Sequence, residues 1–72
     1  MYSVHVHQYE GRDRVSSSSL DCEDRSEAYK IFYMVRDVLV ECDESTYHVQ
    51  VCRDNLGVAA WSRGFGTRFL MD

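Results

Sequence analysis

Three histidines and a cysteine have the types and the spacing of a small chemical site. His5 and His7 alternate with apolar residues near the start of the chain, and His48 and Cys52 belong to a second alternating segment. Alternate side chains of a strand project from the same face of its sheet. If all strands share one sheet, imidazole and thiol groups gather on one face, where they could bind a transition metal. This candidate sheet-face site comprises His5, His7, Tyr9, His48 and Cys52.

The same pattern also fits an exposed polar face without any chemistry. Structural zinc sites show more closely paired ligands than these histidines do, so we predict no bound metal and no cofactor. His48 and Cys52 are four residues apart on one strand, about 13 Å by strand rise, which is too far for the two side chains to react together. We therefore expect a protein that is not an enzyme.

A second candidate surface follows a predicted helix and its two ends. Tyr29, Tyr33 and Val40 recur along one flank with Arg36 between them, and Tyr and Arg are enriched where proteins meet. Acidic residues gather at both helix ends, and those after the helix oppose its macrodipole. Tyrosines that cover the core, and carboxylates that face solvent, explain the same residues without a partner. The predicted partner-binding set is Tyr29, Tyr33, Arg36, Val40, Glu41, Asp43, Glu44, Asp21 and Glu23.

Composition limits the class of protein. The chain has 72 residues, a formal net charge of −4, 44% hydrophobic and 28% charged residues, which is typical of one small folded domain with a marginal core. An acidic domain repels phosphate backbones at long range, so direct nucleic-acid binding is disfavoured. Three cysteines without close spacing favour reduced thiols, and no apolar stretch approaches the roughly 20 residues that span a bilayer. We expect a cytoplasmic protein, in a bacterium or in the host cell of a phage, without a membrane partner.

One helix and four strands are predicted to position these residues. Asp24 and Glu27 form a capping-box pattern, so the helix begins near residue 24. An apolar stripe then recurs at helical spacing and predicts the face that contacts the sheet. The stripe consists of Ala28, Ile31, Phe32, Val35, Val38, Leu39 and Cys42.

The first pair of strands spans residues 2–9 and 14–20. A three-residue loop between them sets Val4 opposite Leu20 and Val6 opposite Ser18. The four serines at 16–19 could instead form a flexible linker, because serine has poor strand propensity. If they form a strand, their small side chains would let the helix approach the sheet closely.

The second pair of strands spans residues 46–53 and 57–63. A type I turn over Asp54 to Gly57 sets Val51 opposite Trp61 and Cys52 opposite Ala60. The predicted fold class is α+β, ββαββ, with one helix on a single, mainly antiparallel four-stranded sheet. Residues 1–64 form this domain, and the apolar C-terminal tail 65–72 either packs back or anchors something else. The side chains expected to cover the helix are Tyr47, Val49, Val51, Ala59 and Trp61.

Arg63-Gly64-Phe65-Gly66 resembles the opening of the RNP1 motif of RNA-recognition domains, whose aromatic residues stack on bases. Thr67 stands where that motif continues with an aromatic residue, so we interpret the glycines as a bend. A sheet face with Tyr9, His5 and His7 keeps single-stranded nucleic-acid binding as an alternative function.

The expected function is stoichiometric binding to a larger protein or nucleoprotein, and its inhibition. In general character, without a shared motif, the sequence resembles small inhibitors from phages and mobile elements, anti-CRISPR proteins among them. The alternatives are a homodimer joined by the tail or by an open sheet edge, a module for single-stranded nucleic acid, and a His/Cys metal site.

Overall fold

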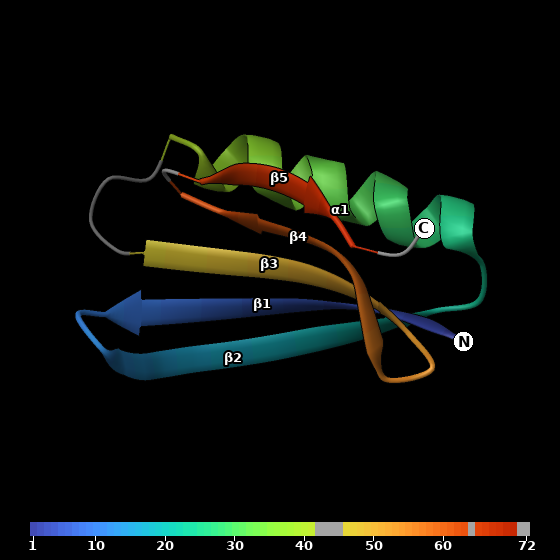
Figure 1. Cartoon of the computed structure of the whole chain (residues 1–72), viewed down its shortest axis with the longest axis horizontal. Helices are drawn as coiled ribbons and strands as arrows, with labels where there is room; N and C mark the ends of the chain where they lie inside the picture. The colour runs from blue at the N-terminus through green and yellow to red at the C-terminus, as the bar shows by residue number, and fades with distance from the viewer. Residues whose placement is uncertain (42–45, 64, 71–72) are drawn as a thin grey trace.

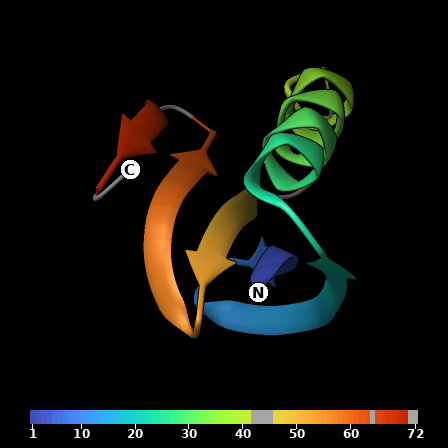
Figure 2. The same cartoon turned by 90° about the vertical axis from the view of Figure 1, so that its right-hand side faces the viewer.

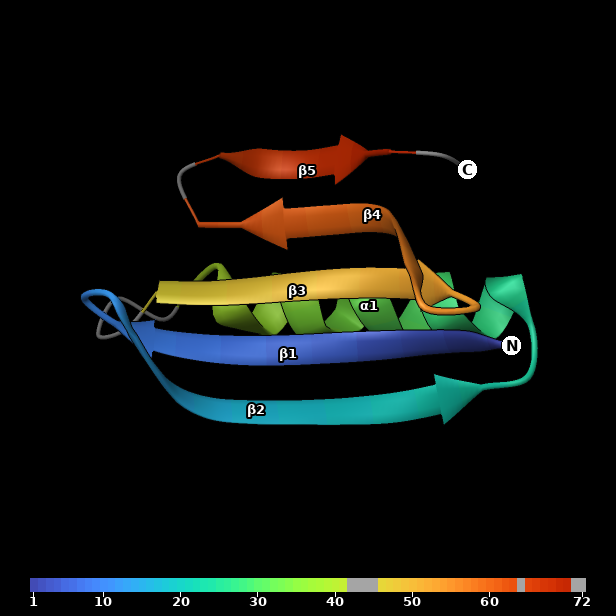
Figure 3. The same cartoon turned by 60° about the horizontal axis from the view of Figure 1, so that its bottom comes forward.

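The computed structural model describes residues 1–41, 46–63 and 65–70 and shows one helix packed on one antiparallel sheet (Figure 1). In chain order the elements are β1 (Tyr2–Glu10), β2 (Asp13–Cys22), α1 (Arg25–Leu39), β3 (Thr46–Arg53), β4 (Leu56–Ser62) and β5 (Gly66–Phe69). The α+β class is confirmed, but the sheet has five strands where four were predicted. Its order is β2-β1-β3-β4-β5 (Figure 3), so β2 and β5 are the two edges.

The serine run forms a strand and not a linker. β2 pairs with β1 with Val4 opposite Leu20 and Val6 opposite Ser18, as predicted. The loop is shorter than expected, because Glu10 pairs with Asp13 and a bulge between Gln8 and Tyr9 restores the register. Gly11 has a φ of +63°, which a two-residue hairpin turn requires and glycine adopts without strain.

The helix begins where its cap pattern predicts. The Asp24 side chain accepts a hydrogen bond from the Glu27 backbone N–H at 2.8 Å, which satisfies a free donor of the first turn. Of the predicted stripe, Ala28 and Phe32 are fully buried, and Ile31, Val35 and Leu39 are partly buried against the core. Within the described ranges, no helix is long and apolar enough to cross a bilayer.

Val38 does not belong to the core, although the stripe included it. Its side chain is 67% exposed, because it lies seven residues after Ile31, on the flank of the helix that β2 does not cover. Cys42, the last predicted member of the stripe, lies outside the described residues.

The hairpin of β3 and β4 has a different turn and register from those predicted. Asp54 and Asn55 have φ values of 51° and 70°, so the turn has two residues in the left-handed region, typical of type I′, and Leu56 already belongs to the strand. Trp61 therefore lies opposite Val49, two residues from the predicted Val51, and Cys52 lies opposite Gly57.

The error in register did not alter which side chains face the helix. A shift of two residues keeps each side chain on its face, so Val49, Val51, Ala59 and Trp61 are buried in the core and Tyr47 packs beside them, as predicted. A bulge between Val51 and Cys52 adds a further core residue, Val58, which is fully buried.

The tail, to which no strand was assigned and which was expected either to pack back or to anchor something else, contributes β5. Gly66 to Phe69 pair with Ser62 to Ala59, antiparallel to β4. Figure 2 shows α1 on one side of a strongly twisted sheet, with β5 and β2 at its opposite edges. The two flanks of the helix therefore face two different edge strands.

Candidate functional site

The helix flank predicted to bind a partner faces β5. Tyr29 is 7% exposed and stacks on Phe69 of β5, with ring centroids 6.3 Å apart. The Arg36 guanidinium lies 4.8 Å from the Tyr33 ring centroid and donates to Thr67 Oγ1 at 3.4 Å. These three helix residues are occupied by contacts within the chain.

The C-terminal end of this flank is also tied to the sheet. Arg63 donates from Nη1 to the carbonyl oxygen of Val40 at 3.2 Å, which satisfies a free carbonyl at the helix end and complements the macrodipole. The Val40 side chain remains 51% exposed, and Glu41 is exposed beside it. Asp43 and Glu44 lie outside the described residues.

The opposite flank of the helix borders an open apolar groove along β2. Val4 and Val6 of β1 form its floor, Ile31 and Val35 of the helix form one wall, and Leu20 of β2 forms the other. Its volume is about 150 Å³. The helix does not close over β2 as we expected, so Leu20 is 53% exposed and every residue of β2 except Cys22 is exposed.

Small side chains keep this groove open. Ser16 and Ser18 share the helix-facing side of β2 with Leu20, opposite Gln8 and Val6, and serine side chains are too short to reach the helix from the edge of the sheet. Among the residues that the structure describes, no strand pairs with the outer edge of this ten-residue strand. Between residues 16 and 20 it carries neither a charge nor a proline, the devices by which proteins block pairing at an edge.

Carboxylates gather around Cys22, between β2 and the helix N-terminus, although none of them lines the groove. Asp21 and Glu23 are exposed on either side of the buried Cys22. Burial raises the pKa of the Cys22 thiol, and the negative charges of Glu27, Asp21 and Asp24 raise it further. These three carboxylates therefore lie close enough to Cys22 to act on its thiol.

The histidines lie together on the sheet face opposite the helix, as strand parity predicted. His7 pairs with His48 across β1 and β3, and His5 pairs with Gln50. The ring centroids of His5 and His7 are 6.4 Å apart, and those of His7 and His48 are 6.3 Å apart, with interplanar angles of 14° and 21°. Tyr9 lines a hollow on the same face beside His48.

Each histidine is hydrogen-bonded to a serine. The distances are 2.8 Å from Ser3 Oγ to His5 Nε2, 3.0 Å from Ser17 Oγ to His7 Nδ1 and 3.0 Å from Ser62 Oγ to His48 Nδ1. Since the rings are nearly parallel, they present faces to one another and do not direct nitrogen atoms to a common point. Across residues 1–41, 46–63 and 65–70, no cluster of three or more His, Cys, Asp or Glu side chains could hold a metal ion.

Burial lowers the pKa of His7 and of His48, and for His7 the positive charge of Arg14 on β2 lowers it further, with smaller contributions from His48 and His5. Both shifts favour the neutral imidazole. Cys52 shares this side of the sheet but is 8% exposed, and burial raises the pKa of its thiol, which disfavours the reactive thiolate.

The groove was not among the residues singled out from the sequence. The residues of its walls have the sequence pattern of ordinary core positions. The one feature that could have indicated an open groove was the run of serines next to Leu20, on a strand predicted to pair with apolar residues. Comparison with known proteins gives no match among protein-family models, curated proteins or solved structures.

Proposed function

We propose that this domain is a non-enzymatic binding module that takes up an extended segment of a partner protein along β2, one segment to one domain. The observation that carries the proposal is the unpaired ten-residue edge of β2 beside the open apolar groove. An added strand gains affinity from main-chain hydrogen bonds, and pockets for its alternate side chains give specificity.

The groove determines which side chains such a segment needs. Every second residue of a strand paired with β2 would point to the helix side, where Leu20, Ile31 and Val35 offer apolar contact. Leu20 is 53% exposed, and burying the remaining half of a leucine side chain contributes about 1 kcal/mol. We therefore expect branched apolar residues at alternate positions of the partner segment.

The acidic residues that follow Leu20 determine the charge of the partner. Asp21 and Glu23 are exposed at the end of β2, with Asp21 paired with Ser3 on the face away from the helix, and Glu27 lies one turn before Ile31 on the helix. Opposite charges steer encounter and fix orientation more than they add affinity. The partner segment should carry Lys or Arg at the end that lies beside Asp21, which keeps the acidic surface of the sequence-based prediction and replaces its tyrosine flank with the groove.

The biological role proposed with this surface is inhibition of a larger protein or nucleoprotein in the cytoplasm. The small size and net charge of −4 support it, as does the general resemblance to small phage and mobile-element inhibitors. A domain of this kind acts by occupying a binding site, so it needs an exposed surface and no enclosed active site.

Selection from a display library of twelve-residue segments tests the proposed function. Ser18→Lys places a charged side chain on the groove side of β2, while Met34→Lys places the same side chain at an exposed position of the helix that does not line the groove. Segments selected on the unaltered protein should be alternating and basic at one end. They should bind Met34→Lys with unchanged affinity and Ser18→Lys about tenfold more weakly or worse.

Equal binding of the selected segments to both variants would contradict the proposal. Light scattering of the free protein provides a second test. A dimer that Ser18→Lys dissociates and Met34→Lys preserves would assign the edge to a second copy of this chain and would overturn the partner segment as its occupant.

A further inference from the structure

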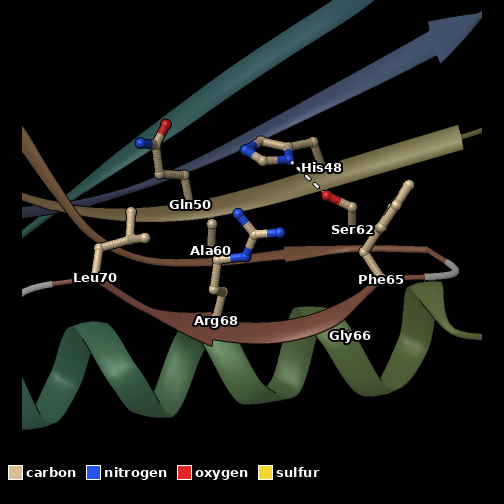
Figure 4. A pocket seen from close by; sticks show the side chains of 8 residues that line it. All are labelled: His48, Gln50, Ala60, Ser62, Phe65, Gly66, Arg68 and Leu70. Atoms are coloured by element: carbon tan, nitrogen blue, oxygen red, sulfur yellow. Dashed lines mark hydrogen bonds between the residues drawn. The ribbon is translucent and has the colours of Figure 1, made fainter.

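The sheet face opposite the helix has a hollow over β3, β4 and β5 (Figure 4). Its volume is about 380 Å³, within the lower range of small-molecule pockets, which is roughly 300–1,000 Å³. All labelled side chains in Figure 4 project away from the helix, so the hollow and the groove lie on opposite sides of the sheet. Its lining residues are His48, Gln50, Ala60, Ser62, Phe65, Gly66, Arg68 and Leu70.

The strand register creates this hollow. Ala60 lies directly between Gln50 on β3 and Arg68 on β5, and Gly66 lies at the end of the neighbouring row. Small residues in the middle of long side chains leave a depression in the face. The depression therefore rests on three hydrogen-bonded strands, which hold the lining residues in fixed relative positions.

Three polar side chains on the hollow, Arg68, Gln50 and His48, retain groups that can donate hydrogen bonds to a ligand. Within the described part of the chain, no carboxylate lies within ion-pair distance of Arg68, and the Gln50 amide forms no hydrogen bond. His48 is bonded to Ser62 through Nδ1, which leaves its Nε2 available. Figure 4 shows Arg68 extending from β5 past Ala60 toward β3, where Gln50 and His48 lie.

Phe65 supplies an apolar face at one end of the hollow. It is 83% exposed and also lines a neighbouring hollow of about 330 Å³ that contains Tyr9 and Arg63. None of the residues lining either hollow is acidic, although the chain carries a net charge of −4. An arginine in a hollow without carboxylates favours an anionic ligand.

We propose that this hollow binds a planar ring that carries an anionic oxygen group, either a carboxylate or a phosphate. Arg68 binds the anion through its planar fork of N–H donors, which matches both groups. The Gln50 amide donates a second hydrogen bond, and His48 donates from Nε2 while the Ser62 hydroxyl donates to Nδ1. The ring of the ligand stacks on Phe65.

A small ligand fits these observations better than a nucleic-acid strand. The acidic chain repels a phosphate backbone at long range, and this face offers two exposed arginines to it, Arg14 and Arg68, at opposite edges of the sheet. The hollow instead collects its donors and its aromatic ring around one position.

Titration with benzoate and with adenosine monophosphate, followed by NMR of the amide signals, tests the site and separates the two anions. We expect saturable shifts centred on Arg68, Gln50 and Ala60 with at least one ligand. Arg68→Gln should weaken binding about tenfold or more, because a charge-assisted hydrogen bond is lost. Arg12→Gln, at the exposed β1–β2 turn, removes the same charge and should change affinity less than about twofold.

Ala60→Ile provides an uncharged test, since it fills the hollow with a side chain that suits a strand. It should abolish binding while Ser18→Lys, on the other side of the sheet, retains it. Saturation by benzoate alone assigns a carboxylate, and saturation by adenosine monophosphate alone assigns a phosphate. Equal weakening by Arg68→Gln and Arg12→Gln, undiminished binding to Ala60→Ile, or no saturation by either ligand up to about 10 mM would each overturn the proposal.

Discussion

The two flanks of α1 differ in what covers them. On one flank, β5 packs against aromatic and cationic side chains, with Phe69 on Tyr29 and Thr67 bonded to Arg36. On the other, Ile31 and Val35 face β2 across an open groove. The Tyr and Arg flank has the composition of a protein interface, and within this chain it forms the contact between α1 and β5. The aliphatic flank has the composition of a protein core, yet the side chains of β2 do not cover it.

Truncation on the two flanks should have very different effects on stability. Tyr29→Ala removes a side chain that is 7% exposed and contacts both Phe32 and Phe69, so the free energy of unfolding should fall by about 3 kcal/mol. Val38→Ala, at a side chain that is 67% exposed, should change it by less than about 0.5 kcal/mol. Urea unfolding of both variants measures the difference, and similar losses would show that the flanks are not distinct.

Phe69→Ala tests how firmly β5 covers its flank. Loss of the stack on Tyr29 should lower the free energy of unfolding by about 1 kcal/mol, since Phe69 is otherwise 57% exposed. Phe65→Ala is the matched control, because this ring is 83% exposed and precedes the same strand. A change below about 0.3 kcal/mol for Phe69→Ala would mean that β5 contributes little to the covered flank.

Acid should lower the free energy of unfolding through the two histidines on the sheet face opposite the helix. The pKa of His7 and of His48 is lowered in the folded protein, so between those values and about 6.5 the unfolded chain binds more protons. The free energy of unfolding should therefore fall as the pH decreases from about 7.5 to 5.5. Urea unfolding across this range, with His7→Gln/His48→Gln as the control, should show a smaller loss in the double variant. An equal loss in both proteins would assign the acid sensitivity to other groups.

The two histidines should respond differently to a change on β2. Arg14 of β2 helps to lower the pKa of His7, whereas burial alone accounts for His48. Arg14→Gln should raise the pKa of His7 and leave that of His48 unchanged, as measured by NMR titration of the ring protons. Equal shifts of the two pKa values would mean that the charge of Arg14 does not act selectively on His7.

Local patterns predicted most of the fold, whereas non-local contacts were missed. The cap at Asp24 and the pairing of Val4 with Leu20 depend on neighbouring residues, and both predictions are confirmed. β5 is four residues long and turns only Thr67 and Phe69 toward the helix side, which is too few for a periodic signal. The predicted type of the turn at Asp54 and Asn55 was wrong, because both residues adopt a positive φ, which we had expected only for Gly57.

The candidate sites divide in the same way. Strand parity placed His5, His7 and His48 on one face, and they lie there. The groove could not be predicted, because it depends on how far the helix extends across the sheet, and the helix packs over β1 and β3 without covering β2 (Figure 3). Tyr29 and Tyr33 were assigned to a partner for a related reason, since the strand that covers them was not recognised.

Amide hydrogen exchange of the free and segment-bound protein tests the central claim most directly. The unpaired edge of β2 should exchange readily in the free domain, as exposed strand edges do. Addition of a segment selected from the display library should slow exchange across Asp13–Cys22 and leave β5 unchanged. Protection confined to β5 or to the open histidine face, with β2 unaffected, would contradict the account.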